Sequence, residues 1–201
     1  ILCNETIDFY IVTNSKAKKR LEEVTEKPVH VIPHQAVSSE IILKNIEKKP
    51  KVIGYLGTKD QLYARKNIKN LCKINKLEFY ENHPMTRQEC IDDLRKIDIG
   101  IIYLERNNRT NYVLEYKPNQ KLTNFQCFGI PAIICEYESY KEFGGKESYL
   151  LANSTEDIEN CIEKLIMSIK LRKDIQKNGY IAAERLLVKN IVKEYDFITK
   201  Q

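Results

Sequence analysis

Short apolar runs alternate with amphipathic stretches through the middle of the chain, and this alternation is the feature that most constrains the fold. The runs at 51–57 (KVIGYLG), 98–104 (DIGIIYL) and 131–135 (PAIIC) are apolar almost throughout. Strands of this kind are typical of a parallel sheet whose two faces are both covered by helices. Because parallel crossovers are right-handed, the pattern predicts a doubly wound sheet with helices on both faces.

Weaker signals complete this pattern and give the fold class as α/β and Rossmann-like. Two more strands are expected at 77–81 and 149–153. Helices are expected at 61–75, in the stretch capped by Thr86, and at 118–127. Two or three helices follow a cap at Ser154 or Thr155. The first fifty residues predict a strand at 8–13, a helix from Ser15 to about Val24, a strand at 28–33, and at 38–50 either a short helix or a linker.

The charge and composition of the chain limit the classes of partner that it is expected to bind. The formal net charge is +5, but acidic and basic residues are interleaved, without the dense Lys/Arg block typical of nucleic-acid binding. No apolar run is long enough to span a bilayer. His30, His34 and His83 are scattered, so no metal site is expected. We therefore expect no nucleic acid, no transmembrane segment and no metal.

The cysteines and the first ten residues indicate where in the cell the protein is expected. The chain has six cysteines, and no two of them have the spacing of a zinc or redox motif. They are expected to be reduced core thiols. The first ten residues lack the features of a signal peptide. Together these observations predict a cytoplasmic location. Because the sequence begins at Ile1 rather than Met, we also expect a piece of a longer protein.

Lys117 and Lys121 precede and open the helix expected at 118–127. A helix N-terminus carries unpaired N–H groups and the positive end of the helix dipole, so two lysines there favour an anion such as a diphosphate. Gly129 and Pro131 then end the helix and lead into the next strand. Two solvated surface lysines are the alternative that the spacing leaves open.

Five segments, in order, resemble the C-terminal, donor-binding domain of GT-B glycosyltransferases, in particular glycosyltransferase families 1 and 4. The segment KPNQKLTNFQCFGIPAI resembles the family's donor-site helix and Gly-x-Pro turn, and VIPHQAV resembles the turn before that domain. The other three are VIGYLGTKDQLYARKNIKNL, FYENHPMTRQECIDDLRKIDIGIIYL and the closing helices from Ser154.

The resemblance implies a division of the chain and a partner. Residues 1–35 would be a remnant of, or linker from, an N-terminal acceptor domain. Residues 36–188 would form the donor-binding domain, and 189–201 a closing helix. The missing acceptor-binding domain would lie in the same polypeptide or in a second subunit. No catalytic residue can be assigned, because in this family a catalytic base usually belongs to the missing half.

The same resemblance implies site residues by segment. Many retaining members carry two glutamates where this chain has Tyr116, beside Glu115, and Asn124. A neutral asparagine puts the family's ribose contact in doubt. The implied residues are Gly57, Thr58, Arg65, Lys66, Lys117 and Lys121 for the diphosphate; Glu115, Tyr116, Leu122 and Asn124 for the ribose or sugar; and Asn82, His83, Pro84 and Met85 for the base.

The implied function is transfer of a sugar from a nucleoside diphosphate sugar to a glycan or other hydroxyl acceptor, without a metal. UDP is favoured over GDP, because the base loop contains no acidic side chain to pair with guanine, although Glu81 lies next to it. A non-catalytic nucleotide-binding or regulatory module on the same fold is the alternative. A sugar-nucleotide epimerase is a third possibility.

Overall fold

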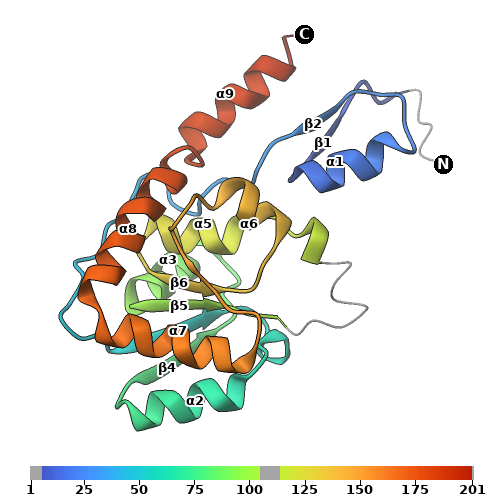
Figure 1. Ribbon diagram of the computed structural model, residues 1–201. Helices are drawn as coiled ribbons and strands as arrows, with labels where there is room; N and C mark the ends of the chain where they lie inside the picture. Colours follow the sequence, from blue (N-terminus) through green and yellow to red (C-terminus); the bar gives the residue numbers. More distant parts are fainter. Residues whose placement is uncertain (1–5, 105–113, 201) are drawn as a thin grey trace.

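The computed structural model describes residues 6–104 and 114–200, and its centre is a parallel sheet (Figure 1). The strand order is β4-β3-β5-β6-β7, and each neighbouring pair is parallel. After β3 the chain forms β4 on one side of it and then crosses back to form β5 on the other side. This reversal is expected of a doubly wound sheet. The strands are β3 (Val52–Leu56), β4 (Glu78–Asn82), β5 (Ile99–Ile102), β6 (Ala132–Ile134) and β7 (Leu150–Leu151).

Helices cover both faces of this sheet, so the predicted α/β, Rossmann-like class is confirmed. α2 and α7 lie on one face, and α3 and α5 on the other (Figure 1). Thr86 caps α3 in a reciprocal capping box with Glu89, as expected. Ser154, one of the two caps left open by the sequence, caps α7. The helices of the body are the 3-10 turn η1 (Lys59–Gln61), α2 (Arg65–Ile74), α3 (Arg87–Lys96), α5 (Gln120–Cys127), α6 (Glu138–Phe143), α7 (Thr155–Met167) and α8 (Ile169–Glu184).

The first part of the chain forms a separate βαβ unit beside this body. β1 (Tyr10–Val12) and β2 (Val29–Val31) make a two-stranded parallel sheet with α1 (Ser15–Glu22). The cap of α1 is Asn14 rather than Ser15, because the Asn14 side chain accepts a hydrogen bond from the N–H of Ala17. The last helix, α9 (Val188–Ile198), extends from the body on the side where this unit lies (Figure 1).

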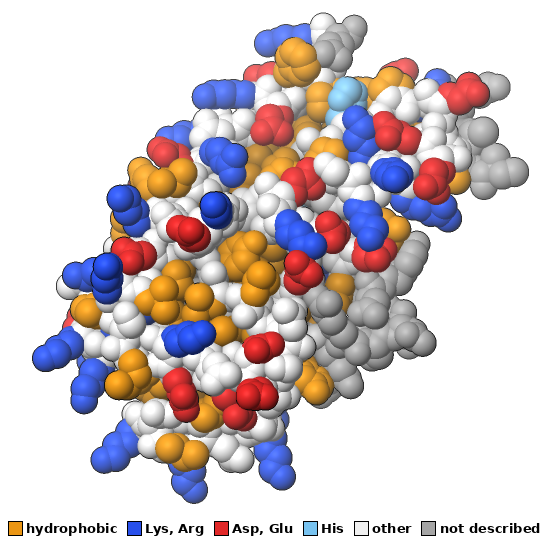
Figure 2. All heavy atoms as spheres, viewed as in Figure 1, with side chains coloured by type: hydrophobic (Ala, Val, Ile, Leu, Met, Phe, Trp, Pro, Cys, Tyr) orange, Lys and Arg blue, Asp and Glu red, His pale blue; other side chains and the backbone are white. Residues whose placement is uncertain are grey.

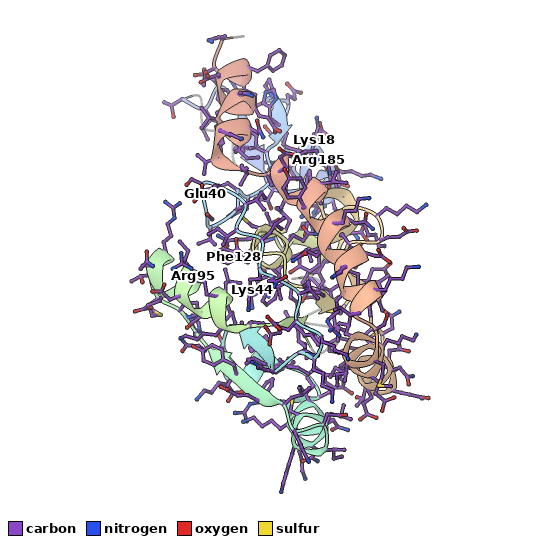
Figure 3. All side chains as sticks on the ribbon, turned by 90° about the vertical axis from the view of Figure 1, so that its left-hand side faces the viewer. Lys18, Glu40, Lys44, Arg95, Phe128 and Arg185 are labelled. Atoms are coloured by element: carbon purple, nitrogen blue, oxygen red, sulfur yellow. The ribbon has the colours of Figure 1, made fainter. Side chains whose placement is uncertain are left out.

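The segment at 38–50 is a linker without helix, which decides between the two alternatives left by the sequence. Side chains fasten it to the body. The buried guanidinium of Arg172 donates to the carbonyls of Glu47 and Lys48, at 2.8 and 3.0 Å. Lys44 points inward to Asp98, 3.2 Å away, and lies near the buried ring of Phe128 in the view of Figure 3. None of the described helices is both long and apolar enough to cross a membrane.

α5 is packed directly against the sheet. Every residue from Leu122 to Cys127 is buried. A Cβ on Gly100 of β5 would lie only 2.8 Å from the ring of Phe125, so glycine is what allows this close approach. At the other end, Gly129 adopts a positive φ of 62° and turns the chain toward β6. The described cysteines are free thiols: Cys72, Cys127, Cys135 and Cys161 are buried, Cys90 is half-buried, and Cys3 lies outside the described residues.

The sequence did not predict α6, which follows β6. Its six residues are too few for a clear helical period.

Candidate functional site

A cavity of about 640 Å³ opens at the carboxyl ends of β3 and β4, beside the N-terminus of α5. This is the position at which a doubly wound sheet binds its ligands, next to the strand where the chain order reverses. The cavity contains eight of the residues expected from the sequence: Gly57, Thr58, His83, Pro84, Met85, Lys117, Lys121 and Asn124.

Lys121 dominates the electrostatics of this cavity. It lies in the first turn of α5, and its Nζ sits 5.0 Å from the centre of the Tyr55 ring. A Cβ on Gly57 would collide with that Nζ, so the ammonium rests against the backbone of the loop after β3. Burial, and then the positive charge of Lys117, lower the pKa of Lys121 to about 8.

Lys117 adds a second positive charge at the mouth of the cavity. Burial also lowers its pKa. Within residues 6–104 and 114–200, neither lysine forms an ion pair with a carboxylate. Two neighbouring ammonium groups that have lost part of their water, and that meet no carboxylate among the described residues, form a site complementary to an anion with several charges. This geometry disfavours the alternative of two solvated surface lysines.

The loops after β3 and β4 form a joined wall of the cavity. The N–H of Gly57 donates to the carbonyl of Asn82 at 2.8 Å, and the Thr58 hydroxyl lies 3.2 Å from Nδ1 of His83. The side chain of Asn82 points elsewhere, because its Nδ2 donates to the buried carboxylate of Asp93 at 2.6 Å. Asn82 therefore supports the expected base loop from behind.

Arg65 and Lys66, expected to contact a diphosphate, do not line the cavity. The Arg65 guanidinium forms a two-point contact with Glu81, and Lys69 lies 3.4 Å from the same carboxylate. These contacts, with that to Arg65 the strongest, lower the pKa of Glu81. Lys66 is exposed on α2. The sequence could not show that Arg65, unlike Lys117 and Lys121, lies outside the cavity, because this depends on the position of Glu81 in space.

Three of the residues expected at the ribose or sugar, Glu115, Tyr116 and Leu122, also lie outside the lining of the cavity. The Glu115 carboxylate pairs with Lys16 of α1 at 2.8 Å. Leu122 is buried in the core beneath α5.

Asn124 is in the cavity, but its oxygen is already used. Asn124 Oδ1 accepts from the N–H of Val37 at 2.8 Å, and Arg87 Nε donates to the Val37 carbonyl at 2.6 Å. Val37 is thus held between α5 and α3, and it forms part of the cavity wall. The sequence analysis missed this wall. The position of Arg87, the first helical residue after the base loop, was the sequence signal that could have placed this residue at the cavity. Other lining residues that the sequence did not predict include Gln35, Ala36, Gln61, Cys90, Gln120 and Val188.

The charged side chains on the face shown in Figure 2 form no dense patch of one sign. Figure 2 shows positive and negative side chains interspersed over the face it presents. Among the described residues, no group of three His, Cys, Asp or Glu side chains is arranged to hold a metal ion. The cavity with its two lysines is therefore the candidate site.

Solved structures with the same architecture include HepE from Anabaena in complex with UDP and glucose (12% identity, TM-score 0.69). Its alignment covers 100% of this chain and 65% of HepE. The fold is that of GT-B glycosyltransferases. The sucrose-phosphate synthase from Thermosynechococcus elongatus is also similar, at 12% identity and a TM-score of 0.62, with 98% of this chain and 59% of that protein covered.

The trehalose-6-phosphate synthase OtsA is a third example, at 10% identity and a TM-score of 0.62, with 96% of this chain and 60% of OtsA covered. The chain therefore spans less than two thirds of each of these three GT-B proteins. No protein-family model and no curated protein matches the sequence. The expected likeness to the C-terminal half of a GT-B protein is confirmed at the level of fold.

Replacing Lys121 with methionine should strengthen the ligand-free fold and weaken anion binding. Lys121→Met removes a partly desolvated ammonium that has no carboxylate partner in the part of the chain that the structure describes, so the free energy of unfolding should rise by about 1–2 kcal/mol. Affinity for pyrophosphate should fall by about tenfold or more. Urea denaturation and titration calorimetry measure the two effects. The exposed Lys66→Met is the matched control, and we expect it to change neither quantity. A destabilised Lys121→Met with unchanged affinity would contradict the assignment.

Anion affinity should fall as the pH rises above about 8. Below this pH the Lys121 ammonium is already charged, whereas above it binding must take up a proton, so affinity should decrease by up to about tenfold per pH unit. Calorimetry in buffers of different ionisation enthalpy measures this uptake directly, with sulfate as the ligand because its charge is constant over this pH range. The arginine of Lys121→Arg keeps its charge at every pH tested, so only the smaller proton uptake due to Lys117 should remain in this variant. Equal proton uptake by both proteins would show that Lys121 does not titrate on binding.

Proposed function

We propose that this chain binds the donor in a glycosyltransferase that moves a sugar from a nucleoside diphosphate sugar to a glycan or other hydroxyl acceptor. The observation that carries the proposal is that Lys121 lines the cavity, lies over Tyr55, and forms no ion pair with a carboxylate of residues 6–104 and 114–200. A leaving diphosphate gains negative charge as the bond to the sugar breaks, and preorganised ammonium groups stabilise that charge. Lys117 and Lys121 would supply this stabilisation without a metal.

Three features support UDP as the nucleotide. Guanine presents N–H donors that a free carboxylate would recognise, but the carboxylates around the base loop are engaged. Glu81 pairs with Arg65, Glu89 accepts from the backbone of the loop at 2.8 Å, and Asp93 is buried against Asn82. His83, Pro84 and Met85 form a wall without a carboxylate, which suits a base such as uracil. In addition, HepE structures contain UDP or UDP-glucose.

The acceptor side of the proposal concerns the parts outside this cavity. We propose that residues 1–35 belong with an acceptor-binding domain, that 36–188 form the donor-binding domain, and that 189–201 close it. The separate βαβ unit and the limited coverage of the GT-B structures support this division. The acceptor domain would lie in the same polypeptide or a second subunit. A cytoplasmic location stays a prediction from the cysteines and the first residues.

Nucleoside diphosphates should stabilise the chain, and UDP should do so at lower concentration than GDP. At about a hundred times its dissociation constant, UDP should raise the free energy of unfolding by roughly 2.7 kcal/mol, because only the folded state binds it. A thermal-shift series with UDP, GDP and pyrophosphate measures the effect, and Lys121→Met serves as the control that should lose it. If no nucleoside diphosphate moves the midpoint, the proposal is wrong.

The chain by itself should hydrolyse a UDP-sugar slowly and transfer little to an acceptor. Much of the rate of transfer comes from holding the acceptor hydroxyl close to the sugar, and the proposal assigns that task to the acceptor-binding domain. An assay with radiolabelled UDP-glucose separates the outcomes. Slow release of glucose fits a donor-binding half, fast saturable transfer would show that the βαβ unit suffices, and UDP binding without any turnover would favour a non-catalytic nucleotide-binding module.

A further inference from the structure

We infer that Asn14, in the βαβ unit, is a positioning residue for Lys117: its side chain ties the start of α1 to the backbone that carries this lysine. The inference rests on the proposed function, because it assigns to the βαβ unit a part in diphosphate binding. It concerns a contact between residues more than a hundred positions apart in the sequence.

Asn14 is completely buried, and both ends of its amide are used. Its Oδ1 caps α1 by accepting from the N–H of Ala17 at 2.8 Å. Its Nδ2 points to the carbonyls of Glu115 and Lys117, at 3.4 and 3.5 Å. One side chain therefore fixes the first turn of α1 and the loop before α5 together. A buried amide that satisfies both partners resists displacement, since moving either element would leave buried polar groups unpaired.

The residues after Asn14 strengthen the same contact. Lys16 pairs with the Glu115 side chain at 2.8 Å. Ser15 donates from its N–H and from its hydroxyl to the two carboxylate oxygens of Glu142 in α6, at 2.9 and 2.5 Å. The beginning of α1 thus contacts both the loop that carries Lys117 and the helix after β6, and in Figure 1 α1 lies to the right of α6.

A second asparagine holds the other end of this short loop. Asn119 is completely buried, and it exchanges hydrogen bonds with the backbone N–H and carbonyl of His34, each at 3.1 Å. Lys117 lies between these two anchors, and neither belongs to the sheet. Lys121 is different, because α5 packs on the sheet through Phe125 and holds it independently. Loss of Asn14 should therefore disturb Lys117 and leave Lys121 in place.

The contact makes ligand binding and docking of the βαβ unit reciprocal. If docking of α1 orders Lys117 and so favours the diphosphate, the bound diphosphate must favour docking by the same factor. In the proposed enzyme, a diphosphate bound at the donor site would therefore favour docking of the βαβ unit, which lies in residues 1–35 and is assigned to the acceptor side.

Asn14→Ser tests this with the fold preserved, because serine is an equally good helix cap but cannot reach the loop carbonyls. In hydrogen-exchange mass spectrometry of the ligand-free chain, residues 114–119 should exchange about three- to tenfold faster in this variant. The matched control is Asn75→Ser, an exposed asparagine at the end of α2 that contacts only its own helix. Unchanged exchange at 114–119 in Asn14→Ser would overturn the inference.

A double-mutant cycle on UDP affinity tests the link to Lys117. Asn14→Ser should weaken UDP binding by about three- to tenfold in the native chain and in a His83→Ala background, but by less than about twofold in a Lys117→Ala background. An equal loss in all three backgrounds would show a general structural effect and overturn the inference. If the native chain does not bind UDP at all, the proposed function fails, while the exchange measurement still decides whether Asn14 orders the loop.

Discussion

The close packing of α5 on the sheet is the constraint on which the candidate site depends. Gly100 gives Phe125 room to approach β5, and the buried face of α5 then fixes the helix from Leu122 onward. Its N-terminus consequently faces the carboxyl ends of β3 and β4, where the cavity opens. Lys121 is brought over Tyr55 by this packing rather than by any attraction between the two side chains, since a cation–π contact alone contributes only about 1 kcal/mol.

The cations of the cavity differ in kind from those elsewhere in the described chain. Arg65 and Lys69 share Glu81, Lys96 pairs with Asp93, and Lys44 pairs with Asp98. For Lys121, by contrast, burial and then the positive charge of Lys117 lower the pKa. Such an arrangement is unfavourable without an anion, and it concentrates the response to an anion in two side chains.

Two sequence signals identified residues that line the cavity. The lysine in the first turn of a helix followed from the pattern, and the glycine after the buried strand at 51–57 followed from the resemblance. The sequence was less informative where a side chain had a choice of partners. Nothing in the local sequence indicates that Asn124 accepts from Val37, that Glu115 pairs with Lys16, or that the cap of α1 also reaches the loop before α5.

The sequence by itself determined the fold class, because the alternation of apolar strands and helices leaves few ways to bury both faces of a parallel sheet. It also indicated where α3 and α7 begin, since the capping groups at Thr86 and Ser154 lie next to these helices in the chain. Only the tertiary structure decided which charges are neutralised. Arg65 and Lys121 are both cations near the start of a helix, and the sequence does not distinguish them. In the structure Arg65 pairs with the Glu81 carboxylate, whereas Lys121 lies against the backbone of Gly57. Contacts of this kind join residues that are distant in the chain, so they exist only once the sheet has formed.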